Sequence, residues 1–101
     1  MNIHIHIDDD LIGEVELRVI DESMWVVGGN LIPTPLYQKY QAQIQVLYNT
    51  VGIAGMRDFN FKAIFQGLVL DPQGGIGITD SEEFNEIYVD IAGVDMSKFR
   101  L

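Results

Sequence analysis

The sequence lacks cysteine, and this excludes disulfides, thiolate metal ligands and thiol nucleophiles. It is also poor in basic residues, because six lysines and arginines stand against 15 acids, for a net charge of −9. This balance disfavours binding to DNA, RNA or an anionic membrane, since a polyanion repels the chain. No apolar run approaches the roughly 18 residues of a membrane helix, and no signal-peptide pattern is found. We therefore expect a cytoplasmic protein with no nucleic-acid or membrane partner.

The composition that remains is that of one globular domain. The chain has 101 residues, of which 48% are hydrophobic and 21% charged. A domain of this size buries roughly two-thirds of its unfolded surface, so it needs no metal or disulfide to fold. No internal repeat, linker or low-complexity segment divides the sequence. We expect a single domain over residues 1–101.

The N-terminal third shows the period-2 alternation of half-buried strands. Apolar residues alternate with polar ones in three segments, which predict three short-linked strands: Ile3–Ile7, Val15–Val19 and Met24–Val27. The acidic stretch Asp8–Asp10 and residues Asp21–Ser23 are typical of turns between them. Gly28 and Gly29 interrupt the third strand and indicate a bulge or a close backbone approach.

The clearest local signal is a helix. Thr34 is a favourable N-cap, and Pro35 occupies the first helical position, where a missing N–H has no cost. Apolar and aromatic residues then recur at helical spacing up to Val51. Gly52 is placed to end the helix in the left-handed conformation. The pattern predicts one helix over residues 35–51.

The remainder predicts two more strands and several connections. A long strand is expected over residues 59–70, a turn over 71–75, a single helical turn over 79–83, a strand over 87–91 and a short docked tail over 95–101. The order is thus β-β-β-α-β-β. We expect a single α+β domain in which one amphipathic helix packs on one face of a mainly antiparallel sheet of about five strands.

No set of residues predicts catalysis. His4, His6 and Asp8 fall on one face of the first strand, an arrangement that fits either a divalent-metal site or a solvated strand face. Same-face neighbours stand about 7 Å apart, which is a poor fit around a compact ion without further ligands. No nucleophile, base and orienting group occur together, and no phosphate-binding loop is present. We therefore expect a non-enzymatic protein with no catalytic residues, no cofactor and no metal site.

The charge is concentrated at the two ends of the chain. Residues 1–22 carry −6, residues 23–79 carry +1 and residues 80–101 carry −4. If the ends meet in the fold, they form one negative surface that steers a basic protein partner. The expected partner-binding residues are Asp8, Asp9, Asp10, Glu14, Glu16, Asp80, Glu82, Glu83 and Glu86.

Two resemblances bear on function. The segments Asp21–Tyr37, with its Pro-Thr-Pro helix start, and Gly77–Asp80 resemble a pattern in uncharacterised small bacterial proteins. In size, acidity and lack of a catalytic set, the chain is similar to immunity proteins of bacterial toxin systems. That resemblance implies binding and neutralisation of a cognate basic toxin domain, such as a nuclease. The alternative is a homo-oligomeric structural or phage-encoded accessory module whose charge only keeps it soluble.

Overall fold

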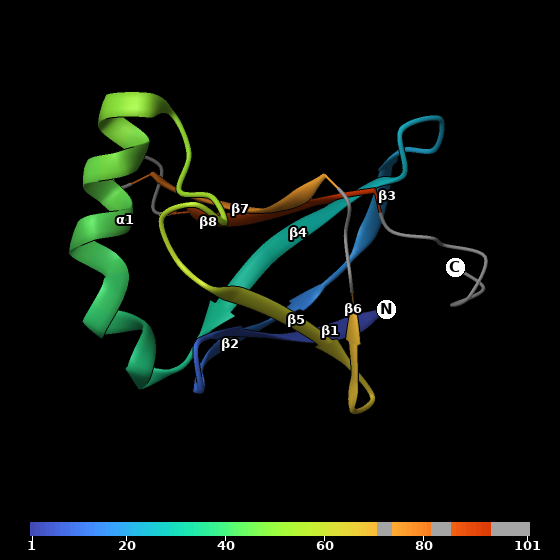
Figure 1. Cartoon of the computed structure of the whole chain (residues 1–101), viewed down its shortest axis with the longest axis horizontal. Coiled ribbons are helices and arrows are strands. Elements are labelled where there is room, and N and C mark those ends of the chain that lie inside the picture. The colour runs from blue at the N-terminus through green and yellow to red at the C-terminus, as the bar shows by residue number, and fades with distance from the viewer. Residues whose placement is uncertain (71–73, 82–85, 94–101) are drawn as a thin grey trace.

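The computed structural model describes residues 1–70, 74–81 and 86–93 (Figure 1). Two-residue periodicity in the strands and helical periodicity after Pro35 produce the elements in the following order. They are β1 (Asn2–Ile7), β2 (Asp10–Glu16), β3 (Arg18–Asp21), β4 (Val26–Pro33), the 3-10 turn η1 (Pro35–Tyr37), α1 (Gln38–Val51), β5 (Phe61–Phe65), β6 (Leu68–Leu70), β7 (Gly75–Ser81) and β8 (Glu86–Ala92).

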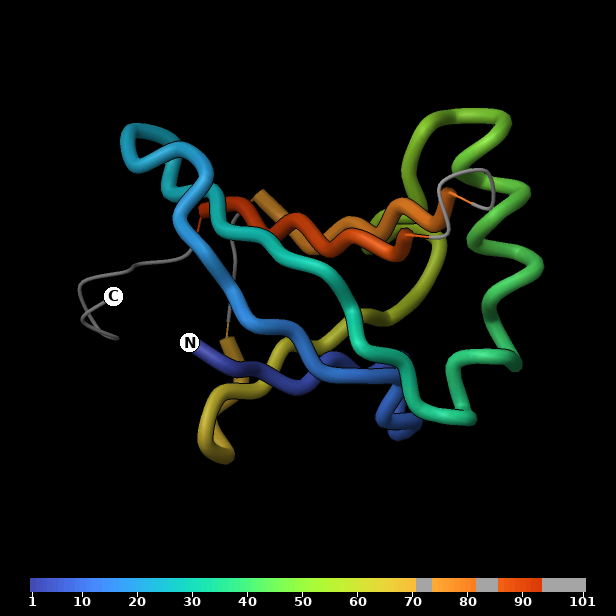
Figure 2. The backbone as a smooth tube through the Cα atoms, turned by 180° about the vertical axis from the view of Figure 1, so that it is seen from behind, coloured from blue at the N-terminus to red at the C-terminus, as the bar shows by residue number. Residues whose placement is uncertain are grey.

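All strands belong to one curled antiparallel sheet. Its order is β6-β5-β1-β2-β4-β8-β7, and β3 pairs with the first part of β4. Strand β4 runs diagonally between two layers, one containing β5, β1 and β2 and the other containing β8 and β7 (Figures 1 and 2). Its first part pairs with β3 and its last part with β2, while β8 lines its other edge.

The hydrophobic core fills the inside of the curl, and α1 closes one end of it (Figure 1). The isoleucines of β1 are at most 1% exposed, and the inward residues of β4, β7 and β8 meet them. Tyr37 and Ile44 are the buried residues of the helical segment, 1% and 0% exposed. The α+β class and the antiparallel sheet that the sequence predicts are confirmed.

The expected number of about five strands is too low, since eight strands are described. The predicted strand over 59–70 is two strands, β5 and β6, joined by a tight turn at Gln66 and Gly67. Both turn residues have positive φ, 50° and 81°, as in two-residue hairpins. Glutamine is an unusual residue at the first position of such a turn, so the sequence pattern places Gln66 within one long strand.

Two further strand limits differ from the prediction. The second predicted strand divides at Leu17, which is 3% exposed and whose N–H donates to the Met1 carbonyl at 2.7 Å. Met24 and Trp25 belong to the β3–β4 turn and not to a strand, and Trp25 has a φ of 53°. Strand β4 continues through Gly28 and Gly29 without interruption.

The helix is confirmed with one change at its start. Residues 35–37 form the 3-10 turn and residues 38–51 the α-helix, which Gly52 ends with a φ of 91°. Thr34 is not a side-chain cap, because its hydroxyl donates to the Leu11 carbonyl at 2.5 Å. This bond ties the start of the helical segment to β2.

The helical turn expected over 79–83 is wrong for its described part. Thr79, Asp80 and Ser81 belong to β7 and pair with the start of β8. Inter-strand hydrogen bonding prevails here over the local capping signal. The expected turn over 71–73, residues 82–85 and the tail over 95–101 lie outside the described residues.

Candidate functional site

The outer face of the sheet, opposite the core, carries polar side chains from both ends of the chain. Alternation along β2 places Glu14 and Glu16 on this face, between the buried Ile12, Val15 and Leu17. Along β8 the same alternation places Glu86, Tyr88 and Asp90 outside while Val89 and Ile91 are buried. The outward acids of β2 and of β8 therefore share one face.

Strand β4 brings these two groups together. Glu14 lies opposite Ile32 in the β2–β4 register, and Asn30 lies opposite Tyr88 in the β4–β8 register. Ile32 is 63% exposed, so it stands out from the middle of the face. The outer face thus has an apolar centre with carboxylates on both sides.

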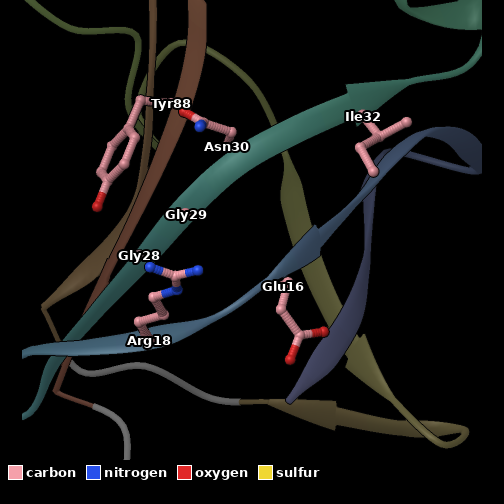
Figure 3. Close-up of a pocket in the computed structure, with 7 residues that line it drawn as sticks. All are labelled: Glu16, Arg18, Gly28, Gly29, Asn30, Ile32 and Tyr88. Atoms are coloured by element: carbon pink, nitrogen blue, oxygen red, sulfur yellow. The ribbon is translucent and has the colours of Figure 1, made fainter.

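A groove of about 370 Å³ crosses this face (Figure 3). We call it the central groove, and it is lined by Glu16, Arg18, Gly28, Gly29, Asn30, Ile32 and Tyr88. In Figure 3 the Arg18 side chain extends across β4 toward Gly28, while the Tyr88 ring stands on the other side of that strand. The groove is open at the surface and offers one carboxylate, one guanidinium and one phenol.

Two glycines in β4 make this groove possible. A Cβ at Gly28 would lie 2.8 Å from the Val89 carbonyl oxygen and 2.9 Å from the Tyr88 hydroxyl. A Cβ at Gly29 would collide with the Glu16 carbonyl oxygen. The backbone therefore approaches closely at both positions, as the Gly-Gly pair predicts.

Burial perturbs the acid–base properties of two side chains on this face. Desolvation raises the pKa of the Tyr88 phenol, and the negative charge of Asp90 raises it further, while Arg18 lowers it. Desolvation also raises the pKa of Asp90, which is half-buried. These shifts mark the β8 side of the face as the less hydrated one.

The acids of the β1–β2 turn lie at a corner of the sheet close to the start of α1. Asp9 is exposed, and Asp8 accepts a 3.3 Å hydrogen bond from the Asn60 amide. Asp10 forms an ion pair with Lys39 at 2.8 Å and accepts a hydrogen bond from the Tyr40 hydroxyl. These bonds, chiefly that of Lys39, lower the pKa of Asp10. Asp10 is thus already engaged within the chain.

The expectation that Asp80 contributes to a binding surface must be corrected. Asp80 is 4% exposed and accepts hydrogen bonds from the Tyr37 hydroxyl at 2.8 Å and from the amides of Gln41 and Gln45 at 3.2 and 3.3 Å. Its carboxylate therefore joins β7 to the helical segment. Of the other expected residues, Glu86 is exposed, whereas Glu82 and Glu83 lie outside the described residues.

The three candidate metal ligands of β1 have different surroundings. The register shifts between Ile5 and His6, so the regular strand that would align them is broken. His4 lies with its Nε2 atom 3.9 Å from a Glu14 carboxylate oxygen, and Asp8 lies in the turn beside Asn60. Within residues 1–70, 74–81 and 86–93, no three His, Cys, Asp or Glu side chains come together as a metal-binding group.

The sequence interpretation did not select three residues that shape the outer face, namely Ile32, Tyr88 and Asp90. Tyr88 and Asp90 carry a usable signal, since they alternate with the buried residues of β8. Ile32 carries none, because an apolar residue between Leu31 and Pro33 is ordinary.

Comparison of the chain with protein-family models, curated proteins and solved structures gives no match. In the part of the chain that the structure describes, no helix is long and apolar enough to cross a membrane.

Proposed function

We propose that the chain is a non-enzymatic immunity or inhibitor protein that binds a basic toxin domain through the outer face of its sheet. The observation that carries the proposal is the union of Glu14, Glu16 and Glu86 on one face, across β4. Their field attracts and orients a cationic surface over roughly a Debye length, about 8 Å at physiological salt.

The apolar centre of the face supplies binding affinity, to which the charged rim contributes less. Protein interfaces combine a desolvated apolar centre with a polar rim, and the rim contributes more to association rate than to affinity. Ile32 and the ring of Tyr88 stand in the centre, where Glu16 and Arg18 line the same groove and Glu14 lies opposite Ile32. Asp8 and Asp9 extend the negative field around the corner of the sheet.

A genetic experiment tests this function. Each protein encoded beside the gene of this chain is expressed alone and together with the chain. The proposal expects one of them to be lethal alone, to be tolerated together with the chain and to bind it after purification. If none is lethal alone, or if the lethal one is unaffected by the chain, the proposal is refuted.

The role of the outer face is tested with a matched pair of charge reversals in the purified complex. Glu86→Lys changes an exposed acid of the face, and Glu22→Lys makes the same change in net charge at the β3–β4 turn. We expect Glu86→Lys to slow association roughly threefold to tenfold at low salt and to weaken its salt dependence. Equal effects of the two variants would assign the attraction to net charge and contradict the proposed face.

One observation favours the second candidate, a homo-oligomeric accessory module. Strand β6 ends the strand order of the described sheet, and its Leu68 and Val69 are 56% and 58% exposed. An edge strand of this kind is a site for strand pairing between copies. Sedimentation at several concentrations separates the candidates. A stable large homo-oligomer would support the module, and a monomer would contradict it.

A further inference from the structure

A second hollow, of about 310 Å³, lies on the outer face where β7 and β8 meet the segment after α1. We call it the Asp90 hollow. Its lining is mostly glycine and apolar side chains, with one carboxylate: Ile53, Gly55, Met56, Gly74, Gly75, Ile76, Gly77, Asp90 and Ala92. Ile53 and Met56 are 38% and 44% exposed, so apolar surface is open on one side of the hollow.

The wall opposite Asp90 is held in place by backbone hydrogen bonds. Ala54 exchanges two of them with Ile78 of β7, at 2.9 and 2.8 Å, and fixes the segment over the strand. The Asp58 carboxylate accepts the Gly55 N–H at 2.9 Å and closes the following turn. The hollow is therefore formed before any ligand arrives, which reduces the ordering cost of binding.

Glycines on both neighbouring strands place no side chain of their own beside Asp90. Gly28 of β4 and Gly77 of β7 lie directly opposite Asp90 in the two registers. Ordinary residues at these positions would present side chains beside the carboxylate. The close contacts around both glycines, with the Val89 carbonyl at Gly28 and with Ile53 at Gly77, leave no room for a Cβ without a shift of these neighbours.

Among the aspartates that the structure describes, Asp90 alone combines burial with the lack of a partner. Asp8, Asp10, Asp58 and Asp80 each accept a hydrogen bond from another side chain or from the backbone. Asp90 is half-buried, yet it makes no hydrogen bond or ion pair with any residue among 1–70, 74–81 and 86–93. Desolvation accordingly raises its pKa. A carboxylate in this state gains from a cationic donor more than a fully hydrated one does.

We propose that the Asp90 hollow receives an arginine side chain of the protein partner, with the guanidinium on the Asp90 carboxylate and the alkyl stem against Met56 and Ile53. This rests on the proposed function, because it assigns a specific contact to the basic partner. Arginine fits better than lysine for two reasons. Its planar guanidinium donates two parallel hydrogen bonds to a carboxylate, and it is more weakly hydrated, which suits a partly apolar hollow.

The test uses the isolated chain and N-acetyl-arginine amide as the probe, followed by amide NMR. We expect saturable shifts at Gly75, Gly77 and Ala92, with a Kd on the order of millimolar. Asp90→Asn keeps the size of the side chain and should weaken binding at least fivefold. Glu22→Gln makes the same change in charge away from the hollow and should leave the Kd unchanged.

Three results would overturn the inference. They are no saturable shift in the wild-type chain, equal binding by Asp90→Asn, and equal binding of N-acetyl-lysine amide, which would remove the assignment to arginine. The probe needs no toxin, so the result is independent of the genetic test. A chain that protects cells but does not bind the probe contradicts only this inference. A chain that binds the probe but protects against no neighbouring protein contradicts only the proposed function.

Discussion

The buried carboxylate of Asp80 gives the sharpest test of how helix and sheet are held together. Of the three hydrogen bonds to this carboxylate, the one from the Tyr37 hydroxyl is the shortest, at 2.8 Å. Tyr37 is itself 1% exposed. Burial, and secondarily the bond to Asp80, raise the pKa of Tyr37 well above its usual range. The raised pKa favours the protonated phenol, which is the form that donates to Asp80.

Removal of this hydroxyl by Tyr37→Phe leaves the ring packing intact and deletes one bond to a charged acceptor. Such bonds contribute about 1.5–3 kcal/mol, and because Asp80 keeps the amides of Gln41 and Gln45 as donors, the loss lies toward the lower part of the range. We expect a loss of about 2 kcal/mol in the free energy of unfolding. For a domain of this size that corresponds to a fall in Tm of roughly 10 °C.

The assay is urea denaturation followed by far-UV circular dichroism, with the slope m compared between variants. Tyr48→Phe is the matched control, because Tyr48 lies in α1, which directly follows Tyr37, is half-buried and makes no hydrogen bond among the described residues. It should change stability by less than about 0.5 kcal/mol. If Tyr37→Phe costs no more than Tyr48→Phe at unchanged m, the bond to Asp80 does not stabilise the fold and the reasoning fails.

Two further predictions concern β4 and the β1–β2 corner. Gly29→Ala places a methyl group against a backbone carbonyl of β2 and should lower the free energy of unfolding by about 3 kcal/mol or more. In the control variant Gly55→Ala the methyl group meets nothing within 4 Å, so its stability should lie within about 0.5 kcal/mol of wild type. Thermal melts compare the two variants, and similar losses of stability would refute the close approach at Gly29. The lowered pKa of Asp10 means that its ion pair with Lys39 stabilises the fold above the ordinary carboxyl pKa, near 4, and is lost as pH falls through the lower folded value. Asp10→Asn should therefore lower the urea midpoint at pH 7, and its effect should shrink as the pH falls below the ordinary carboxyl value; a difference that does not shrink on acidification would contradict this assignment.

Local patterns predicted the elements whose side chains repeat regularly. The isoleucines of β1 and the helix after Pro35 follow periods that any buried face requires, so their existence was readable. The β5–β6 turn could not be predicted in this way, because Gln66 adopts a positive φ that its residue type does not indicate. Thr79–Ser81 shows the opposite case, in which a helix-like sequence is held extended by pairing with β8.

Local sequence patterns predicted even less of the candidate site. The outward alternation of Glu86, Tyr88 and Asp90 was visible in the sequence, and so was the acidity of both ends. What makes Asp90 unusual is the pair of glycines beside it, Gly28 and Gly77, which come from distant parts of the chain. Properties that depend on such pairings cannot be read from a local pattern.

The strand order has a consequence for the speed of folding. Four hairpins, β1–β2, β3–β4, β5–β6 and β7–β8, join neighbours in the chain, and such hairpins form in about 1–10 μs. The sheet is complete only when β1 meets β5 and β4 meets β8, which are far apart in the sequence. Because these two encounters must close long loops, we expect the domain to fold on the millisecond-to-second scale typical of non-local β-sheets. Until they occur, the edges of β1 and β4 that later carry β5 and β8 have unpaired backbone groups, and a nascent chain is most exposed to aggregation during that interval.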